Sequence, residues 1–382
     1  MGIFKNMDKG RKSIGRFVGA AALVLGFLPC ATQAQFTYTT NSPDTSTITI
    51  TKYTGAGGSV DIPATIGGRT VTVIGATAFA SCSNVTGVTI PGAVKTIGFA
   101  AFQRCSGLTN VAIPASVTVI DTAAFNLCGN LTSVALPGSV TNAGNGLFAQ
   151  CFRLTNIAVS ATNPAYRCSD GVLFDIGQTR LIQCPGAKNG DYAVPDGVVR
   201  IETMAFAGCS NLTSIALPNS VAEIGDASFN LCAGLTSLTI PAGVSTIGQY
   251  AFAWCTGMTH VYFCGNAPLV GQYVLSNSIQ AVVCRLPCAT GWPTVPDAWG
   301  NQPTALWLPQ VWSDEDLDLQ GNPFGFHAAW AAGKTVVVDT CTSLAAPDWQ
   351  PLQTNVLADG TAYFSDAPQT SDPRRFYRLR SP

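Results

Sequence analysis

The feature that most constrains the fold of this chain is a 23-residue repeat that begins after residue 60. Each copy holds an isoleucine, leucine or valine followed by proline, then a phenylalanine, and then a cysteine three residues after the phenylalanine. The phenylalanines of the clear copies are Phe79, Phe102, Phe125, Phe148, Phe206, Phe229 and Phe252. The matching cysteines are Cys82, Cys105, Cys128, Cys151, Cys209, Cys232 and Cys255. This period predicts a solenoid of stacked coils, because one copy cannot bury its own apolar side.

The spacing is regular except between Cys151 and Cys209, which are 58 residues apart. This gap is one regular copy plus 35 residues, so it holds a longer and divergent copy. The sequence therefore predicts one irregular coil, residues 158–193, inside an otherwise uniform stack.

Within a copy, one strand is predicted where apolar residues occupy the first, fourth and sixth places, as in residues 131–136. Alternation then points Val134 and Leu136 inward and leaves Ser133 and Ala135 outward. Pro137 lacks a backbone N–H and ends this strand. A second short extended run, such as residues 117–120, precedes the step that carries the phenylalanine ring into the core.

The stretch 240–255 matches almost every position of the motif I-P-x-x-V-x-x-I-G-x-x-A-F-x-x-C. With this motif, residues 36–265 resemble the BspA-like leucine-rich repeats of bacterial surface antigens. The resemblance implies a β-rich solenoid, a leucine-rich-repeat right-handed superhelix of 23-residue coils. It also implies export, a role in adhesion or protein binding, and no catalytic residues supplied by the fold. One departure is Asn142-Ala143-Gly144, where the family expects I-G, and a local distortion is predicted in that coil.

The N-terminal residues 1–34 have the order of a secretory signal peptide. Five basic residues precede an apolar run at 17–28, and Thr32-Gln33-Ala34 supplies a small-residue cleavage site. We expect cleavage before Gln35, in preference to a buried N-terminal helix or to lipidation at Cys30. Removing these residues leaves 15 basic and 20 acidic side chains. This net negative charge provides no basic surface to attract nucleic acid. No second apolar stretch reaches membrane-spanning length.

The predicted solenoid covers residues 35–265, and residues 266–309 are predicted to form a C-terminal cap and linker. Residues 310–382 lack the repeat and predict a small β-sandwich-like domain with strands at 335–340, 349–357, 361–364 and 375–380. Asp359-Gly360 between two of these runs is a hairpin signal. The end of the chain also resembles a C-terminal β module of exported bacterial proteins.

The repeated cysteines are predicted to be buried thiols that pack under the turn of each coil. A disulfide ladder is the alternative, because stacked coils place neighbouring α-carbons at bridging distance. Replacing Cys128 by serine is expected to cost roughly 1–3 kcal/mol if the hydroxyl stays unpaired, and replacing it by alanine less. A bridge is predicted where cysteines cluster in the cap, among Cys264, Cys284 and Cys288.

Catalytic machinery is scarce in this sequence. Only His260 and His327 are available for a histidine-dependent triad, and no nucleotide-binding, zinc-protease or esterase motif occurs. No cofactor or metal is therefore expected. The leading hypothesis is an exported or surface-associated protein that presents a concave repeat surface to a protein or glycan. A secreted hydrolase, which would need two carboxylates together in a deep cleft, and a purely structural cell-envelope role are the alternatives.

The predicted binding strip consists of the outward residues of successive strands, which would form one concave surface five to eight coils long. None of these residues is charged, and His260 and Tyr262 supply the largest contact area, although an outward strand histidine is more often simply solvated. Tyr262→Ala is expected to weaken binding with little change in stability, and arginine at positions 133 and 214 is expected to reduce binding as well. The residues are Thr109, Asn110, Thr132, Ser133, Thr213, Ser214, Thr236, Ser237, His260 and Tyr262.

Overall fold

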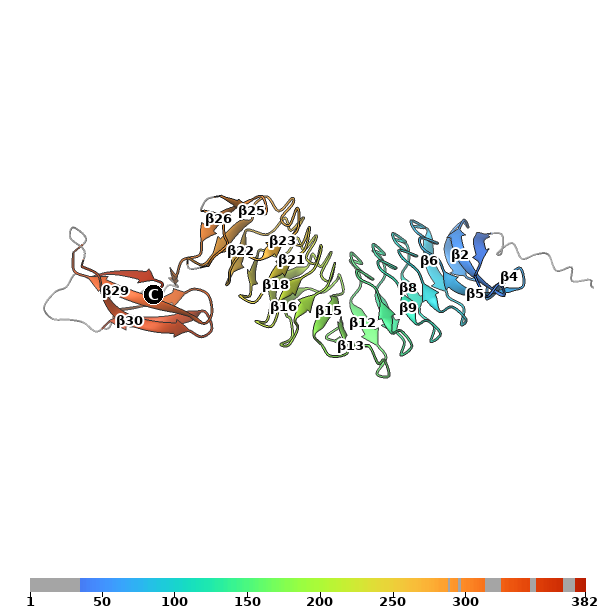
Figure 1. Cartoon of the computed structure of the whole chain (residues 1–382), viewed down its shortest axis with the longest axis horizontal. Coiled ribbons are helices and arrows are strands. Elements are labelled where there is room, and N and C mark those ends of the chain that lie inside the picture. Colours follow the sequence, from blue (N-terminus) through green and yellow to red (C-terminus); the bar gives the residue numbers. More distant parts are fainter. Residues whose placement is uncertain (1–34, 288, 295–296, 313–323, 344–347, 367–374) are drawn as a thin grey trace, which may run out of the picture.

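The computed structural model describes residues 35–287, 289–294, 297–312, 324–343, 348–366 and 375–382. The predicted signal peptide, residues 1–34, lies outside them. Within the described residues, the regular elements are all β-strands. Figure 1 shows an elongated stack of coils that leads into a smaller β domain at the C-terminal end. The predicted β-rich solenoid is therefore confirmed.

The longer strand of each coil lies on one side of the stack, which we call the long-strand face. Neighbouring strands pair in parallel within the groups β3-β6-β8, β10-β12, β16-β18 and β20-β22-β24-β26. The bounds are β3 (Gly58–Asp61), β6 (Val85–Thr89), β8 (Asn110–Ala112), β10 (Ser133–Leu136), β12 (Asn156–Val159), β16 (Gly190–Ala193), β18 (Leu212–Ala216), β20 (Ser237–Ile240), β22 (His260–Phe263), β24 (Val282–Arg285) and β26 (Gln302–Leu306).

The shorter strands form a second side, the short-strand face. An antiparallel N-terminal strand, β1 (Phe36–Thr40), starts the first of its two sheets, and the coil strands then follow in parallel. The first sheet contains β2 (Thr47–Tyr53), β5 (Arg69–Ile74), β7 (Thr96–Ile97), β9 (Val119–Ile120) and β11 (Asn142–Ala143), with β4 (Thr65–Ile66) beside β5. The second contains β15 (Arg180–Gln183), β17 (Arg200–Ile201), β19 (Glu223–Ile224), β21 (Thr246–Ile247) and β23 (Leu269–Val270).

The core between these faces is built from the inward residues of every coil. Val134 and Leu136 are buried while Ser133 and Ala135 are exposed, as the alternation predicts. The repeated phenylalanines are fully buried and stack along the axis, with 5.2 Å between the ring centroids of Phe102 and Phe125. Parallel coils bring identical rings together, so each ring packs against its own copy rather than against a new partner.

The turn around each phenylalanine forms a third edge, the turn edge, with its own hydrogen-bond ladder. The residues two before and two after Phe102, Ala100 and Arg104, both have left-handed backbones, with φ of 50° and 59°. Such φ values are unusual for residues other than glycine. They alternate the direction of the peptide groups, so that the N–H groups of Ala100, Phe102 and Arg104 donate to the next coil at 2.8–3.0 Å. Stacking of coils therefore stabilises this backbone.

The predicted burial of the repeated cysteines is confirmed for six of the seven, while Cys82 in the first coil is partly exposed. The structure adds a contact that the spacing does not reveal. The thiol of Cys128 donates to the carbonyl oxygen of Phe102 in the preceding coil at 3.1 Å, and Cys105, Cys151, Cys232 and Cys255 repeat this contact. Burial raises the pKa of the Cys151 thiol to about 12. These thiols therefore stay protonated and act as donors.

The last coil shows that a hydroxyl can replace this thiol. Ser278 stands 23 residues after Cys255, is fully buried, and donates to the Phe252 carbonyl oxygen at 2.7 Å. The Cys128→Ser hydroxyl would find the Phe102 carbonyl in the same way, so the premise of an unpaired hydroxyl is wrong. We expect Cys128→Ser to lower the free energy of unfolding by less than about 1 kcal/mol, and Cys128→Ala by at least as much. Urea unfolding of both variants measures the order, and a larger loss for serine would contradict it.

The irregular coil ends one short-strand sheet and begins the next. It contributes an antiparallel hairpin, β13 (Tyr166–Ser169) and β14 (Val172–Asp175), which leads into β15. The Tyr166 hydroxyl accepts a hydrogen bond from the Ala143 N–H at 2.8 Å and so covers the edge of β11. The distortion predicted at Asn142-Ala143-Gly144 is wrong, because β11 keeps its register with β9. The interruption comes after this coil.

The same insertion divides the core and bends the stack. On the turn edge, the coils on either side touch directly, since the Gln150 N–H donates to the Ala207 carbonyl oxygen at 2.9 Å. The extra residues lie on the strand side and act as a wedge. Buried hydrophobic residues of the solenoid accordingly form two clusters, one centred in a first arm (β1–β12) and one in a second arm (β15–β26). The insertion contributes to both, since Leu173 and Ile182 belong to the first cluster and Phe174 to the second. Figure 1 shows the two arms meeting at an angle.

The residues predicted to form the cap continue the ladders of the second arm. β24 pairs with β22 and β26 pairs with β24, both in parallel. Trp292 and Trp299 pack edge-on against Phe263 at 4.8 and 5.0 Å and close the end of the core. Cys264 and Cys284 carry free thiols. Cys288 lies outside the described residues, and a bridge to it stays a prediction.

The C-terminal domain has two three-stranded antiparallel sheets, β27-β28-β31 and β30-β29-β32, which enclose Phe326, Val336 and Phe364. Its strands are β27 (Gln310–Trp312), β28 (Phe324–Ala329), β29 (Lys334–Cys341), β30 (Gln350–Leu357), β31 (Thr361–Asp366) and β32 (Phe376–Arg380). The predicted hairpin at Asp359-Gly360 is wrong, because its two flanking strands lie in different sheets. The predicted small β-sandwich-like domain is confirmed.

Candidate binding surfaces

The predicted strip lies on the long-strand face. Its threonine, serine and asparagine members are exposed, whereas His260 and Tyr262 on β22 are half-buried. The strands align these residues in columns, with His260 opposite Ser237 and Tyr262 opposite Thr239. Small polar side chains thus form a surface of repeated short rows.

The hairpin of the irregular coil divides this strip into two parts. Its turn lies beside β12, where the Gly171 carbonyl oxygen accepts from the Ile157 N–H at 3.1 Å. Lys188 binds the Asp170 carboxylate at 2.7 Å in the same region. The four residues on or directly before β8 and β10 and the six on or directly before β18, β20 and β22 therefore belong to different arms, and charges separate them. One continuous strip, as predicted, is not what the structure shows.

Many hydroxyls of the strip already have partners. The Thr132 hydroxyl donates to the Thr109 carbonyl oxygen at 3.3 Å, and Thr109 donates to Thr86 at 3.1 Å. The Thr213 hydroxyl donates to the Asp191 carboxylate at 3.0 Å. These hydroxyls hold one coil to the previous one. Because each hydroxyl hydrogen is already used in that bond, the threonines can accept a hydrogen bond from a ligand but cannot donate one.

An aromatic cluster closes the strip at its C-terminal end, and it adds Trp307, which the sequence did not predict, to the predicted pair of His260 and Tyr262. The rings of His260 and Tyr262 stack at 5.5 Å, and Trp307 lies 4.7 Å from Tyr262 between centroids. The Trp307 carbonyl oxygen accepts from the indole of Trp330 in the C-terminal domain at 2.9 Å. Burial raises the pKa of the Tyr262 hydroxyl. Tyr262 is therefore part of the packing around the domain junction, and its removal is expected to reduce stability, contrary to the sequence-based expectation.

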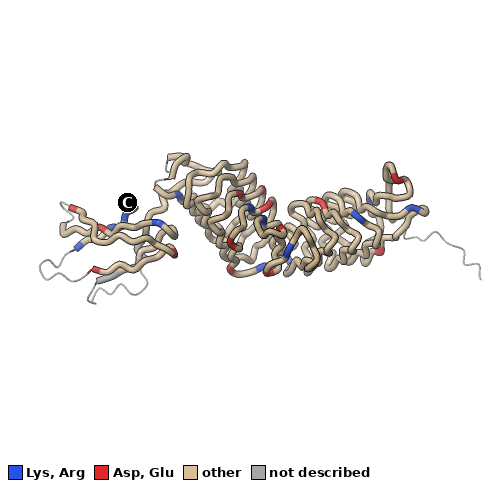
Figure 2. The backbone as a smooth tube through the Cα atoms, turned by 60° about the horizontal axis from the view of Figure 1, so that its bottom comes forward, with Lys and Arg blue, Asp and Glu red and all other residues tan. Residues whose placement is uncertain are grey.

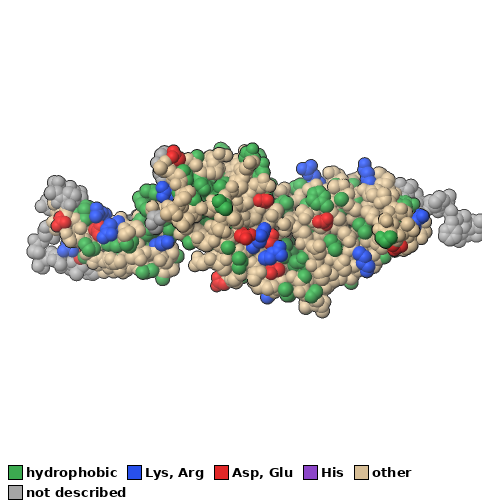
Figure 3. Space-filling view, in the orientation of Figure 1, with side chains coloured by type: hydrophobic (Ala, Val, Ile, Leu, Met, Phe, Trp, Pro, Cys, Tyr) green, Lys and Arg blue, Asp and Glu red, His purple; other side chains and the backbone are tan. Residues whose placement is uncertain are grey.

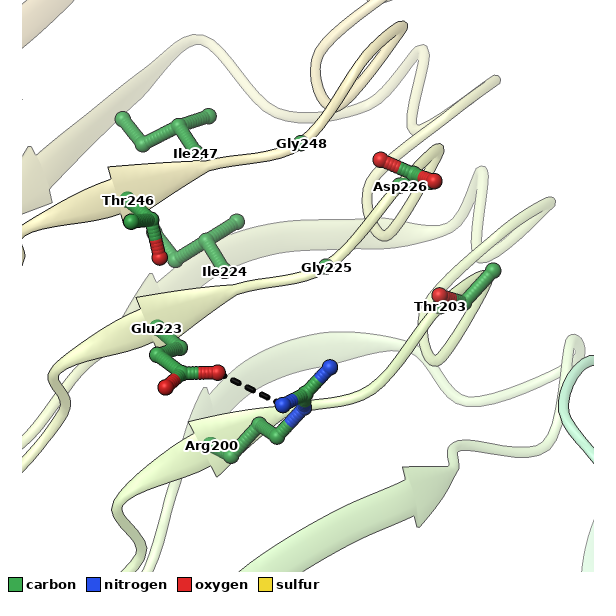
Figure 4. Close-up of a pocket in the computed structure, with 9 residues that line it drawn as sticks. All are labelled: Arg200, Thr203, Glu223, Ile224, Gly225, Asp226, Thr246, Ile247 and Gly248. Carbon is green, nitrogen blue, oxygen red and sulfur yellow. Dashed lines mark hydrogen bonds and ion pairs between the residues drawn. The ribbon is translucent and has the colours of Figure 1, made fainter. Parts of the chain in front are cut away.

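The short-strand face of the second arm carries a row of ion pairs. Glu202, only 2% exposed, accepts from Arg180 at 2.6 Å and from Arg200 at 3.2 Å. Arg200 also binds Glu223 at 2.6 Å (Figure 4). The bond to Glu202 is the main reason that the pKa of Arg180 is raised. Figure 3 shows a group of blue and red side chains near the middle of the solenoid.

Beside these ion pairs lies an open cavity of about 210 Å³, lined by Arg200, Thr203, Glu223 and Asp226 among others (Figure 4). A hydrolase would need one free carboxylate and one protonated carboxyl facing a substrate. Here Glu223 is held by Arg200, and one Asp226 oxygen accepts from the Gln249 N–H at 2.9 Å. The cavity thus has the geometry of a structural ion-pair row. Within the described residues, no group of three or more His, Cys, Asp or Glu side chains could hold a metal.

Residues 59–166 and 184–288 match the family described as the BspA type leucine rich repeat region, in 6 copies. These two stretches make up more than half of the chain. The chain belongs to the BspA-type leucine-rich repeat family. The resemblance inferred from residues 240–255 is thus confirmed, and the matched family is one of repeat proteins rather than enzymes. No curated protein sequence matches this BspA-type chain.

Several solved structures are similar to this BspA-type solenoid. The pneumococcal vaccine antigen PcpA is 18% identical over 72% of this chain and 92% of its own, with a TM-score of 0.49. A leucine-rich repeat protein of T. pallidum is 25% identical over 65% and 84%, with a TM-score of 0.33. A leucine-rich cell surface protein of Faecalibacterium prausnitzii is 23% identical over 67% and 94%, with a TM-score of 0.36.

In the described part of our chain, no helix has the length and apolar character needed to cross a membrane.

Proposed function

We propose that this BspA-type protein is exported or surface-associated and binds a protein or glycan ligand on the long-strand face of its second arm. The observation that carries the proposal is the aromatic cluster of His260, Tyr262 and Trp307 beside exposed, uncharged serines and threonines. Aromatic residues are enriched at the energetic centres of interfaces. The signal-like residues 1–34 and the family membership support a location outside the cytoplasm.

Two alternatives fit the observations less well. A hydrolase lacks support because the clustered carboxylates of the second arm are held by arginines or by backbone N–H groups. A purely structural envelope role would leave the aromatic cluster without a purpose beyond packing. Binding measurements distinguish this structural role from the binding function that we propose.

The divided strip allows a test in which each arm controls for the other. We expect Ser214→Arg to weaken binding to the ligand at least about tenfold, because a long cation would cover the second-arm surface. Ser133→Arg makes the same change on the first arm and is expected to leave binding unchanged. Both positions are exposed, so neither variant should unfold the chain.

The measurement is a pull-down of labelled mature protein against whole cells, matrix proteins and polysaccharides, followed by titration of the partner that is captured. Equal binding by both variants and the parent would exclude the long-strand face. Loss in Ser133→Arg alone would move the site to the first arm.

A further inference from the structure

The coils at the end of the second arm combine an absence of charge with exposed aromatic side chains. Residues 227–284 contain no Lys, Arg, Asp or Glu. Figure 2 draws these last coils without a blue or red residue. Elsewhere a surface of this size would carry several charges, because about a quarter of the residues in an ordinary domain are charged. Six of the exposed large hydrophobic residues nevertheless lie here: Tyr250, Trp254, Leu269, Val270, Tyr273 and Ile279.

Three of these six are aromatic and lie on the turn edge. Phe252 points into the core, while Tyr250 and Trp254, at the two ends of the same turn, point outward and are 41% and 49% exposed. The Ala253 N–H donates to the Tyr250 carbonyl oxygen at 3.1 Å and tightens this turn. In the next coil Tyr273 is 51% exposed, and its ring stacks on that of Tyr250 at 5.2 Å. We call Tyr250, Trp254 and Tyr273 the aromatic ridge.

The repeat shows that folding does not require aromatic residues at these positions. The earlier coils hold small or flexible residues in place of the two tyrosines, namely Thr77, Ala100, Ala123, Gly146, Met204 and Ala227. In place of the tryptophan they hold Ser81, Arg104, Leu127, Gln150, Gly208 and Leu231. All of these residues have the same left-handed backbone, which bulky side chains seldom adopt. Rings that are half exposed at such positions add little to the core, so their role lies at the surface.

We propose that the aromatic ridge is a binding site for a neutral glycan. A pyranose ring has an apolar C–H face that packs on an aromatic ring, and its hydroxyl groups need donors and acceptors at the rim. Exposed amides stand beside the ridge, with Gln249 and Gln272 next to the tyrosines and Asn277 in the tryptophan position of the next coil. These amides both donate and accept. The lack of cations around the ridge selects against sulfated or uronic-acid polymers.

This site is separate from the ligand surface proposed on the long-strand face. The ridge belongs to the turns before β22 and β24, whereas His260 and Tyr262 belong to β22 itself. Leu269 and Ile279, which belong to the same coil as Tyr273, are also exposed. A polypeptide partner would use these aliphatic groups, and it is therefore one outcome of the test.

The repeat also supplies conservative replacements for the test. The triple variant Tyr250→Ala, Tyr273→Ala, Trp254→Leu installs residues that other coils carry at the same positions, such as Ala227 and Leu231. The control variant is Phe99→Ala, which removes an aromatic side chain that is 50% exposed on the first arm, where the equivalent position one coil earlier is Ala76. Circular dichroism and thermal unfolding of the mature chain establish that each variant is folded.

Binding is measured by depletion on insoluble cellulose and chitin and by tryptophan fluorescence titration with starch, xylan and mannan, with heparin as the anionic comparison. We expect the parent to bind at least one neutral polysaccharide, the triple variant to bind it at least about tenfold more weakly, and Phe99→Ala to bind like the parent. The proposal is overturned if no neutral polysaccharide binds, if the triple variant binds equally, or if only heparin or a polypeptide is captured. Glycan binding that Ser214→Arg abolishes and the triple variant retains would assign the glycan to the long-strand face instead.

Discussion

Phe125→Ala is expected to lower the free energy of unfolding by about 3–5 kcal/mol, the range measured for deletion of a buried ring. The ring is fully buried and stacks on two neighbours, with centroids 5.2 Å from Phe102 and 5.6 Å from Phe148. A methyl group at this position leaves a hole in the middle of the stack. The coils cannot collapse into it, because their separation is fixed by the ladders on three sides.

Phe99→Ala provides the matched control, since it deletes the same side chain at an exposed position of the preceding coil. We expect it to change stability by less than about 0.5 kcal/mol. Urea unfolding followed by far-UV circular dichroism measures both variants. Comparable losses in the two would show that the aromatic stack does not stabilise the first arm.

Gln183→Leu is expected to destabilise the protein by about 2–3 kcal/mol, because it leaves several buried polar groups without a hydrogen-bond partner. Gln183 is fully buried where the two core clusters meet. Its carbonyl oxygen accepts from the Phe148 N–H at 3.4 Å, and its amide nitrogen lies 3.2–3.3 Å from the carbonyl oxygens of Cys184, Met204 and Ala205. A single side chain thus joins the last regular coil of the first arm to the first regular coil of the second.

Because Gln183 joins the arms, its loss should also separate their unfolding. We expect the variant to show two calorimetric transitions, whereas Gln103→Leu, which replaces a partly buried amide within one arm, should keep the transition profile of the parent. A single transition at unchanged temperature in Gln183→Leu would refute the joining role.

The regular parts of the fold were predictable because each coil repeats the same pattern of inward and outward residues. The spacing of Phe102, Cys105 and their copies reports the core directly, since a parallel stack places equal residues side by side. The hairpin could not be predicted in this way. Tyr166 and Gln183 have no counterparts in other coils, and their partners, Ala143 and Phe148, come from earlier coils. Only the length of the gap signalled the insertion.

The candidate surfaces were predictable only in part, for a related reason. Outward positions on strands follow from alternation. Trp307 lies beyond the clear repeats, so the periodicity could not predict its contact with Tyr262. The weaker repeat was still readable in Leu275 and Ser278, which stand 23 residues after Phe252 and Cys255. Asp359-Gly360 shows the opposite failure, because a turn motif does not report whether its flanking strands pair.

The uniform register has a consequence for how such a gene can change. A deletion or duplication of 23 codons between equivalent points would leave each surviving phenylalanine and thiol facing the same kind of neighbour. Unequal recombination could therefore shorten or lengthen either arm by whole coils while the protein still folds. The hairpin coil is the exception, since Tyr166 and Gln183 fit one pair of neighbours only. Length variants within the family should thus differ in the number of coils in each arm and share the joint between them.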